Sequence, residues 1–541
     1  MRLKFLCLLL TVSMVLTMVP SVNAATKASS TLDDGQYLIG AGMYDITGPA
    51  AELIMEGYAK SDQIASGIRQ RLRSRAFIVQ DSAGSSAVFV SADIALMFGG
   101  IKEGIIKKLA ENGYGNKYTA ENVMLSSIHT HASLSVCSYY AMYNISAKGF
   151  NRQNYNAIVN GIYMSIVNAH NNLEPGYIEI NQGELEGVSV NRSKVPCNNN
   201  PEEERNRYSS DVDKTMTLLN FRASDGTLLG VVNWFALHST SMNHHNSLVC
   251  GDNKGYASYL FEKDMGSDYL NNSTFVAAFA QSNAGDVSPN INYETLGNEN
   301  GYYGLDDLKN TEYEGENQYL KAKELSSTAT VRLTGSVDCR HTNVDMQNVI
   351  ISEEYNMQHY EGASTLYGKW ILDAYRQEFN KLAQALADGA AVAEGPSTRD
   401  LSDDQVTFVT EVVLDNVPLG KKFGDVVTNT ASSYNRGDTA SATFWGGHPK
   451  NDLKTQSSYL EIQRKTGSTW ITVYYDWDWC TTFNWTRIST LLGTSQVTIT
   501  WDIPEDAPSG TYRIKYNGAD KSGWTGKIRQ HTGYSWEFTV E

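Results

Sequence analysis

Tryptophan is distributed very unevenly along this chain, and its distribution constrains the fold more than any other feature. Eight of the ten tryptophans lie near the C-terminus: Trp445, Trp470, Trp477, Trp479, Trp485, Trp501, Trp524 and Trp536. The same region contains alternating runs at residues 470–475, 497–501 and 511–516, separated by turn signals such as Pro508-Ser509-Gly510. Short strands at such spacing predict a β-sandwich. Tryptophan on alternating strands favours packing between the sheets, with an exposed platform for sugar or membrane as the alternative.

The larger N-terminal part mixes two kinds of pattern. Strands are expected over residues 86–93, 122–128, 230–237 and 274–279, and helices over 101–110 and 155–171. A further helical pattern at 365–387 is followed by a polar stretch through Gly395-Pro396-Ser397. Single cores divide beyond roughly 250–300 residues, and this chain has 541. We therefore expect a mixed α/β domain over residues 25–399 and an all-β domain over 400–541.

The first 24 residues have the pattern of a secretory signal peptide. Arg2 and Lys4 precede an apolar run over residues 5–19, and Val22-Asn23-Ala24 supplies small residues before a cleavage point. A transmembrane helix is the competing interpretation, but the run is shorter than the roughly 20 apolar residues that a span requires. We expect a secreted, extracellular protein. Its five remaining cysteines show no C-x-x-C spacing, and their pairing stays open.

The charge balance argues against one class of partner. The formal net charge is −16, with 60 acidic and 44 basic side chains. Coating of nucleic-acid phosphates depends on clustered Lys and Arg. We therefore expect no nucleic-acid partner.

Three polar segments follow strand-like runs and are candidates for chemistry. In His129-Thr130-His131, an extended backbone would project both imidazoles to one face, where they could reach one ion. His238 stands where a strand gives way to a loop. Ser288 lies in a Gly- and Pro-bounded turn, and no G-x-S-x-G elbow accompanies it. Ordinary hydrogen-bonded histidines and a bare turn are the alternatives.

Longer blocks of sequence resemble the neutral (non-lysosomal) ceramidase family, and they span nearly the whole chain after the first 24 residues. In the N-terminal part the blocks are MEGYA (55–59), SSIHTH (126–131), NRS (191–193), WFALHSTSMN (234–243), GDNKGYAS (251–258), NAGDVSPN (283–290) and YEGASTLYG (360–368). FWGGHPKNDL (444–453) and DWDWCTTFNWTR (476–487) resemble the family's immunoglobulin-like domain. Blocks of this length in this order are far more specific than H-x-H alone.

This resemblance implies a zinc-dependent amidohydrolase that cleaves the N-acyl bond of ceramide to sphingosine and a fatty acid. By position, His129 and His238 match the zinc-binding histidines, Ser288 matches the serine assigned as nucleophile, and His131, Arg192 and Tyr360 match groups around the reacting carbonyl. Zinc can lower the pKa of bound water to about 7 and polarise a carbonyl. Hydrogen bonds from His131 and Tyr360 could stabilise the oxyanion. Whether Ser288 attacks or orients the water and amide is open, and transient contact with a membrane or micelle is possible.

The chain departs from the family where the zinc site should be completed. Residues 337–349 resemble one family block and run almost directly into 352–362, which resembles a much later one. The intervening stretch, which holds the family's glutamate ligand, is absent, so the chain is internally shortened near 349–352. The family's tyrosine ligand lies twelve residues before the tyrosine of YEG, and that position is Asn348 here. Ala132-Ser133-Leu134-Ser135 also replaces the glycine- and proline-rich sequence after H-T-H.

Three hypotheses follow. The chain is a secreted ceramidase whose zinc is held by a reduced or rearranged set of ligands; or it is a non-catalytic or deletion-inactivated homologue that keeps the fold and lipid binding; or it is a zinc amidase for another N-acyl lipid. The two histidines and the GDVSPN serine favour chemistry. The missing ligands favour the second hypothesis.

Overall fold

The computed structural model describes residues 32–33, 35–135, 137–139, 143–144, 147–291, 307–344, 415–522 and 525–541. Several expectations lie outside these residues: the signal peptide, the helix at 365–387, the domain boundary near 400, the shortened stretch near 349–352, and Tyr360.

A nine-stranded sheet forms the framework of the N-terminal part. Its order is β11-β9-β8-β6-β1-β3-β4-β5, with β13 paired to β6. The strands are β1 (Tyr37–Asp45), β3 (Arg73–Gln80), β4 (Ser86–Ala92), β5 (Val123–Ser127), β6 (Glu174–Glu184), β8 (Thr215–Ala223), β9 (Leu228–Phe235), β11 (Val276–Gln281) and β13 (Val331–Arg332). Most neighbours are antiparallel, but β4 pairs with β5, and β9 with β11, in parallel. All four strands that the sequence predicted here are present, with their ends shifted by a few residues.

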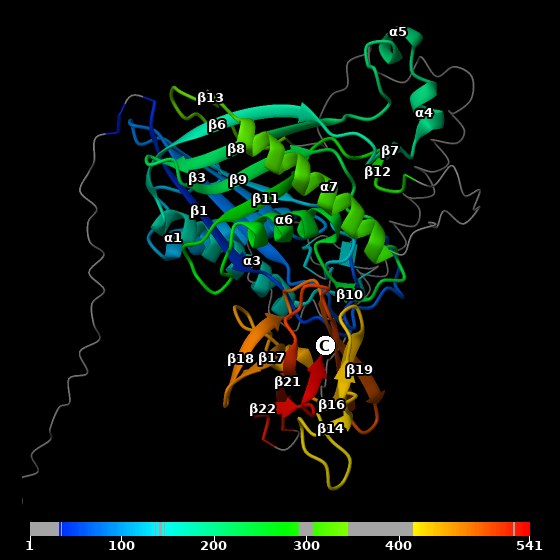
Figure 1. The fold of residues 1–541 in the computed structure, drawn as a ribbon. Helices are drawn as coiled ribbons and strands as arrows, with labels where there is room; N and C mark the ends of the chain where they lie inside the picture. Colours follow the sequence, from blue (N-terminus) through cyan, green and yellow to red (C-terminus); the bar gives the residue numbers. More distant parts are fainter. Residues whose placement is uncertain are drawn as a thin grey trace, which may run out of the picture.

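The sheet bends over on itself, so that its two halves face one another. Phe77 of β3 contacts Phe221 of β8 with ring centroids 4.8 Å apart, and Phe89 of β4 contacts Trp234 of β9 at 5.2 Å. Helices α1 (Gly99–Glu111) and α3 (Arg152–Asn171) cover the outer side of the β1–β3–β4 half. Helices α6 (Asp252–Asp264) and α7 (Asp307–Thr328) cover the outer side of the other half (Figure 1). The N-terminal part is therefore an α/β structure of four layers, helices outside and sheet within.

Helix α3 shows how local sequence sets these elements. Ile158, Ile162 and Ile166 recur every four residues and are buried against the sheet, as expected for one apolar stripe of a helix. The Asn151 side chain accepts a hydrogen bond from the Asn154 amide and so satisfies one free N–H at the helix start. This cap explains why the helix begins at Arg152, earlier than the apolar pattern alone indicates.

The C-terminal part consists of two packed sheets. One contains β19 (Thr481–Ser489), β20 (Thr494–Asp502), β16 (Thr439–Gly446) and β14 (Val426–Thr428). The other contains β15 (Ser433–Tyr434), β23 (Phe538–Val540), β21 (Gly510–Lys521), β17 (Leu460–Thr466), β18 (Thr469–Tyr475) and β22 (Ile528–Tyr534). Two short N-terminal strands, β2 (Gly67–Ile68) and β10 (Leu248–Val249), extend the first sheet beyond β19. The region is sheet-rich as predicted, and its assignment as immunoglobulin-like stays a prediction.

Four of the C-terminal tryptophans are buried in hydrophobic clusters. Trp485 and Trp501 lie in the core between the sheets, whereas Trp477 and Trp479 are buried among residues of the N-terminal part. Trp479 also donates a hydrogen bond from Nε1 to Glu312 of α7 at 2.8 Å. Trp536 differs, with 69% of its surface exposed. Packing between the sheets therefore holds for Trp485 and Trp501, whereas Trp477 and Trp479 pack against the N-terminal part and Trp536 is exposed.

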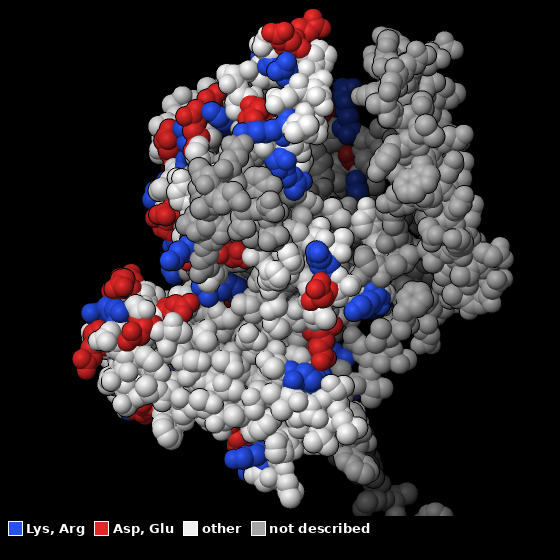
Figure 2. Space-filling view, turned by 90° about the vertical axis from the view of Figure 1, so that its right-hand side faces the viewer, with Lys and Arg blue, Asp and Glu red and all other residues white. Residues whose placement is uncertain are grey.

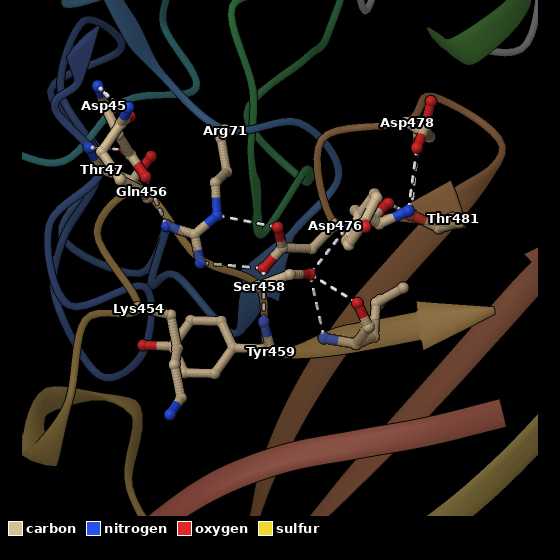
Figure 3. Close-up of polar contacts among 12 residues, drawn as sticks. Asp45, Thr47, Arg71, Lys454, Gln456, Ser458, Tyr459, Asp476, Asp478 and Thr481 are labelled. Carbon is tan, nitrogen blue, oxygen red and sulfur yellow. Dashed lines mark hydrogen bonds and ion pairs between the residues drawn. The ribbon is translucent and has the colours of Figure 1, made fainter. Parts of the chain in front are cut away.

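A buried ion network joins the two parts of the chain (Figure 3). The Arg71 guanidinium donates to both carboxylate oxygens of Asp476, at 2.8 Å each, and to Asp45 at 2.7 Å. The side chains of all three residues are almost completely shielded from water. Asp45 ends β1 and Asp476 follows β18, so this arginine links the N-terminal sheet to the C-terminal sandwich.

The visible surface in Figure 2 carries mixed charge. Lys and Arg side chains are interspersed with Asp and Glu on this face, and neither sign forms a continuous field. In the described parts of the chain, no helix combines the length and apolar character needed to cross a membrane. The five cysteines of these parts are all free thiols.

Candidate active site

The candidate residues lie at one edge of the bent sheet, where two parallel strand pairs end. His129 follows β5, and His238 follows β9. Gln281, at the end of β11, ties the two segments together because its side-chain amide donates to the carbonyls of Ile128 at 3.1 Å and Leu237 at 2.7 Å. The bend of the sheet brings its two end strands, β5 and β11, into contact, and this contact places both histidine segments at the same edge.

The H-T-H segment differs from the extended conformation that we considered from its sequence. Strand β5 ends at Ser127, and His129 has a left-handed backbone with φ of 64°. The histidines still converge, with His131 Nε2 3.2 Å from His129 Nε2. A left-handed turn at His129 therefore brings the two imidazoles together, and not the alternation of side chains along a strand. The periodicity of a sequence cannot reveal such a turn.

Three histidines form one cluster. The ligand atoms of His129, His131 and His238 lie within 4.8 Å of one another. Ring Nδ1 of His129 pairs with the Ala95 carbonyl, and Nδ1 of His238 with the Ala284 carbonyl, each at 2.9 Å. A carbonyl oxygen only accepts, so these two Nδ1 atoms carry the protons and both Nε2 atoms present lone pairs.

Burial keeps the inner histidines neutral. It lowers the pKa of His131 to about 2, with further lowering by the nearby His129, His238 and Arg192. Burial likewise lowers the pKa of His238 to about 4, although the hydrogen bond to Ala284 acts in the opposite direction. Both rings are therefore uncharged near neutral pH, which is the form that binds a metal ion.

The cluster fits a metal ion such as zinc. The Nε2 lone pairs of His129 and His238 belong to a cluster whose ligand atoms all lie within 4.8 Å of one another, a spacing that one metal ion could span. Carbonyl partners on Nδ1 of His129 and His238 are typical of metal-binding imidazoles. The 3.2 Å between the Nε2 atoms of His131 and His129 suits a hydrogen bond that His131 donates and His129 accepts.

Ser288 and Arg192 are brought to His238 by a small two-stranded sheet. Strand β12 (Val287–Ser288) pairs with β7 (Val190–Asn191), with Ser288 opposite Val190. The His238 amide donates to the Val287 carbonyl at 3.0 Å, and Arg192 Nη2 lies 3.5 Å from His238 Nε2. Arg192 is held in place by donating to the Gly285 carbonyl at 2.7 Å. The chain after Arg192 forms α4 (Lys194–Asn198) and α5 (Glu202–Arg205), which project from the body in Figure 1.

The sequence-predicted residues therefore fall into two groups. The first group lies at this edge of the sheet and consists of His129, His131, His238, Arg192 and Ser288. The second group lies outside the described part of the chain. Tyr360 lies outside the described residues, as does Asn348. His131, predicted beside the reacting carbonyl, lies next to His129, with 3.2 Å between their Nε2 atoms.

Two polar residues that support the site were not assigned a role from the sequence. The Asp252 carboxylate accepts hydrogen bonds from the amides of Ser241, at 3.0 Å, and Met242, at 2.9 Å, which fixes the loop after His238. The Asn253 side chain donates to the His238 carbonyl at 3.0 Å. Burial raises the pKa of Asp252 to about 6, against the lowering effect of these amides. The Asp-Asn pair in GDNKGYAS, at a helix start, was the available signal.

Lys254 is a third such residue. It is fully buried and donates to the Phe235 carbonyl at 2.9 Å and the Ala280 carbonyl at 3.2 Å, so it connects the ends of β9 and β11. Burial lowers the pKa of its amine to about 7. Lysine is seldom buried completely, and nothing in the sequence distinguishes this one.

Comparison with known proteins identifies relatives along most of the chain. Residues 37–352 match the family model described as neutral/alkaline non-lysosomal ceramidase, N-terminal, and residues 379–540 match the corresponding C-terminal model. Neutral ceramidase B of Dictyostelium discoideum is 32% identical over 690 residues, covering 96% of each chain. Neutral ceramidase of Pseudomonas aeruginosa is 31% identical over 666 residues, covering 96% of this chain and 97% of that protein.

Solved structures agree with these matches. A structure described as ceramidase complexed with C2 matches with a TM-score of 0.77 and 30% identity, over 94% of this chain and 100% of that chain. A crystal structure of neutral ceramidase from Pseudomonas aeruginosa matches with a TM-score of 0.76 and 31% identity over the same shares. The 690-residue alignment is longer than this chain of 541 residues, so that relative contains sequence with no counterpart here.

Proposed function

The chain belongs to the neutral/alkaline non-lysosomal ceramidase family, and from that premise we propose that it is a secreted, zinc-dependent hydrolase of ceramide. The reaction would break the amide bond and release sphingosine and a fatty acid. The observation that carries this proposal is the cluster of His129, His131 and His238, with Arg192 against His238 at the same edge of the sheet.

His129 and His238 would hold the zinc ion through Nε2. Bound there, zinc would polarise the substrate carbonyl and lower the pKa of a bound water. The carbonyl contacts on Nδ1 keep both rings in the required tautomer and orientation. Two histidines are one protein ligand fewer than a catalytic zinc usually has.

His131 is suited to donate a hydrogen bond and is poorly suited to act as a general base. A pKa near 2, caused mainly by burial, makes its imidazole a weak proton acceptor at neutral pH. The neutral ring can instead donate a hydrogen bond from Nε2 to the developing oxyanion. Arg192 supplies a positive charge beside His238 and can add to this stabilisation.

Ser288 has two compatible roles. As nucleophile, its oxygen would bond to the carbonyl carbon, the C–N bond would break as sphingosine leaves with a proton, and water would then hydrolyse the acyl ester. Alternatively, Ser288 would orient an attacking water. A trapped acyl-serine after brief incubation with ceramide distinguishes the two, because only the first route forms one.

The missing sequence supports a second candidate function. The relatives' alignments extend well beyond this chain, and the expected gap falls on the remaining zinc ligands. A non-catalytic homologue that keeps the fold and lipid binding is the alternative. Hydrolysis of another N-acyl lipid is a further alternative that the same assay separates.

Hydrolysis and metal content decide among these candidates. Fatty acid release from acyl-labelled ceramide and zinc per chain should be measured on wild type, His129→Ala and Ser288→Ala, with the exposed His341→Ala as control. We expect hydrolysis by wild type and the control, loss of zinc and activity in His129→Ala, and loss of activity with retained zinc in Ser288→Ala. If the wild type binds no zinc and releases no fatty acid at neutral and alkaline pH, the non-catalytic alternative is established. Turnover of N-acyl amino acids but not of ceramide would establish the other amidase.

Export and lipid contact complete the proposal. The basic and apolar pattern of the first 24 residues supports secretion. Ceramide resides in membranes or micelles, so a ceramide hydrolase would contact such a surface transiently. Detection of a mature chain beginning at Ala25 in the culture medium of a producing cell tests the first point.

A further inference from the structure

The three clustered histidines are oriented by different means. His129 and His238 are each fixed by a hydrogen bond from Nδ1 to a backbone carbonyl. His131 has no such bond, because its Nδ1 is buried and has no hydrogen-bond partner. The Nε2 of this ring lies 3.2 Å from the Nε2 of His129, but its Nδ1 edge has no polar contact, so packing must hold that edge in place. The proposed function depends on where Nε2 points.

The turn at Gly57 and Tyr58 supplies that packing. It is anchored on the chain just after His131, since the Glu56 amide donates to the Ser133 carbonyl at 3.0 Å and Met55 forms an isolated bridge with Leu134. The turn then passes directly over the imidazole. Both residues come from MEGYA, a segment to which the site described above gives no task.

Gly57 allows this approach because it has no side chain. A Cβ built on it would lie 2.3 Å from Cγ, 2.5 Å from Cδ2 and 2.7 Å from Nδ1 of His131. Its φ of 119° is also in the region that favours glycine. Any other residue here would have to displace either the turn or the His131 ring.

Tyr58 also contacts the His131 ring. Its ring meets that of His131 edge to face, with centroids 4.5 Å apart and planes at 79°. Its hydroxyl donates to the Met242 carbonyl at 2.7 Å, and the Met242 amide is held by Asp252. Tyr58 therefore couples the His131 ring to the loop that begins at His238.

We propose that Gly57 and Tyr58 are positioning residues that set the rotation of the His131 ring and so aim its Nε2 at the His129–His238 pair. They replace, by packing, the carbonyl contact that orients the other two rings. Misplacement of a reacting group by about 1 Å can reduce rate by about 10²-fold, so this role should appear in kcat more than in KM. The inference rests on the proposed function for its kinetic consequence alone, since the ring orientation is a property of the fold.

The test uses substitutions that separate ring contact from backbone strain. Gly57→Ala adds a methyl group against His131. Gly335→Ala is the matched control, because Gly335 has a φ of 111° and an added Cβ there meets nothing within 4 Å. Tyr58→Phe keeps the ring and loses the bond to Met242, whereas Tyr58→Leu loses the ring as well.

Two readouts are needed. The first is the ¹⁵N resonances of the His131 ring in metal-free, histidine-labelled protein, assigned with His131→Gln. The second is kcat and KM for ceramide. We expect Gly57→Ala and Tyr58→Leu to shift the His131 resonances and lower kcat about 10²-fold with little change in KM, Tyr58→Phe to have a smaller effect, and Gly335→Ala to have none.

Unchanged His131 resonances in Gly57→Ala and Tyr58→Leu would overturn the inference, as would equal shifts in Gly335→Ala. If Gly57→Ala does not fold, the comparison of Tyr58→Leu with Tyr58→Phe decides. Failure of the proposed function is a separate result, because it would appear as a wild type without ceramide hydrolysis while the ring resonances still report on the packing.

Discussion

Replacement of Arg71 by methionine should uncouple the two parts of the chain. Arg71 is the shared partner of Asp45 and Asp476, and its guanidinium has no exposed surface. Burial lowers the pKa of the Arg71 guanidinium, but the charges of Asp476 and Asp45 outweigh this and raise it above its ordinary value. Methionine fills similar space and supplies no charge, so both carboxylates would be left buried without their cation.

The expected loss of stability follows from those contacts. Breaking a buried ion pair by removing one partner costs about 3–5 kcal/mol, and here two carboxylates depend on one arginine. Each keeps a backbone partner, Thr47 for Asp45 and Tyr459 for Asp476, which limits the penalty. We therefore expect Arg71→Met to lower the free energy of unfolding by about 4–5 kcal/mol at neutral pH.

Urea unfolding followed by tryptophan fluorescence is a suitable assay, because Trp477 is buried near this interface. A chain of several domains need not unfold in one step, so the first transition is compared. Arg340→Met is the control, since Arg340 pairs with Asp338 while 91% of its side chain is exposed, and surface pairs contribute about 0–1 kcal/mol. The double variant Arg71→Met/Asp476→Asn should regain part of the loss. A first transition for Arg71→Met that coincides with that of Arg340→Met would refute this reasoning.

Three further predictions concern the interface, the site and the core. Burial raises the pKa of Glu52, but hydrogen bonds from His448 and Arg487 outweigh this effect and lower the pKa to about 2. Ionised Glu52 therefore stabilises the fold above its ordinary pKa of 4.5, and this stabilisation is lost as the pH falls toward 2. Between these pH values, the melting temperature of Glu52→Gln should depend less on pH than that of wild type. Asn253→Ala removes the hydrogen bond to the His238 carbonyl and should weaken zinc binding about 10-fold or more in a competition assay with a chelator; unchanged affinity would contradict the supporting role. Trp501→Ala should cost about 3–5 kcal/mol in urea unfolding, whereas Trp536→Ala, at an exposed position, should cost little; equal losses would argue against the packing described here.

The elements of the fold were predictable where one physical pattern dominated. The apolar stripe of α3 and the alternating runs of β18, β20 and β21 correspond to elements of the structure, because each buries one face. The addition of β2 and β10 to the C-terminal sheet was not predictable. Two-residue strands carry no periodicity, and their pairing depends on where distant parts of the chain meet.

The site was predictable in its residue types more than in its geometry. His129, His131 and His238 were identified from strand ends and from the family resemblance, and they do cluster. The left-handed backbone at His129 was missed because it depends on the Ile94 carbonyl and other contacts from outside the segment. Gly57 was missed for the same reason, since its importance lies in a ring that is distant in sequence.

We propose that this chain hydrolyses ceramide with a metal ion held by the histidine cluster. The most direct measurement is titration of chelator-stripped protein with zinc, with bound metal and fatty acid release from ceramide followed in the same samples. We predict that activity rises in proportion to bound zinc and saturates at one ion per chain, and that His129→Ala neither binds nor responds. Full hydrolysis by the stripped protein, or stoichiometric zinc binding that survives in His129→Ala, would contradict this proposal.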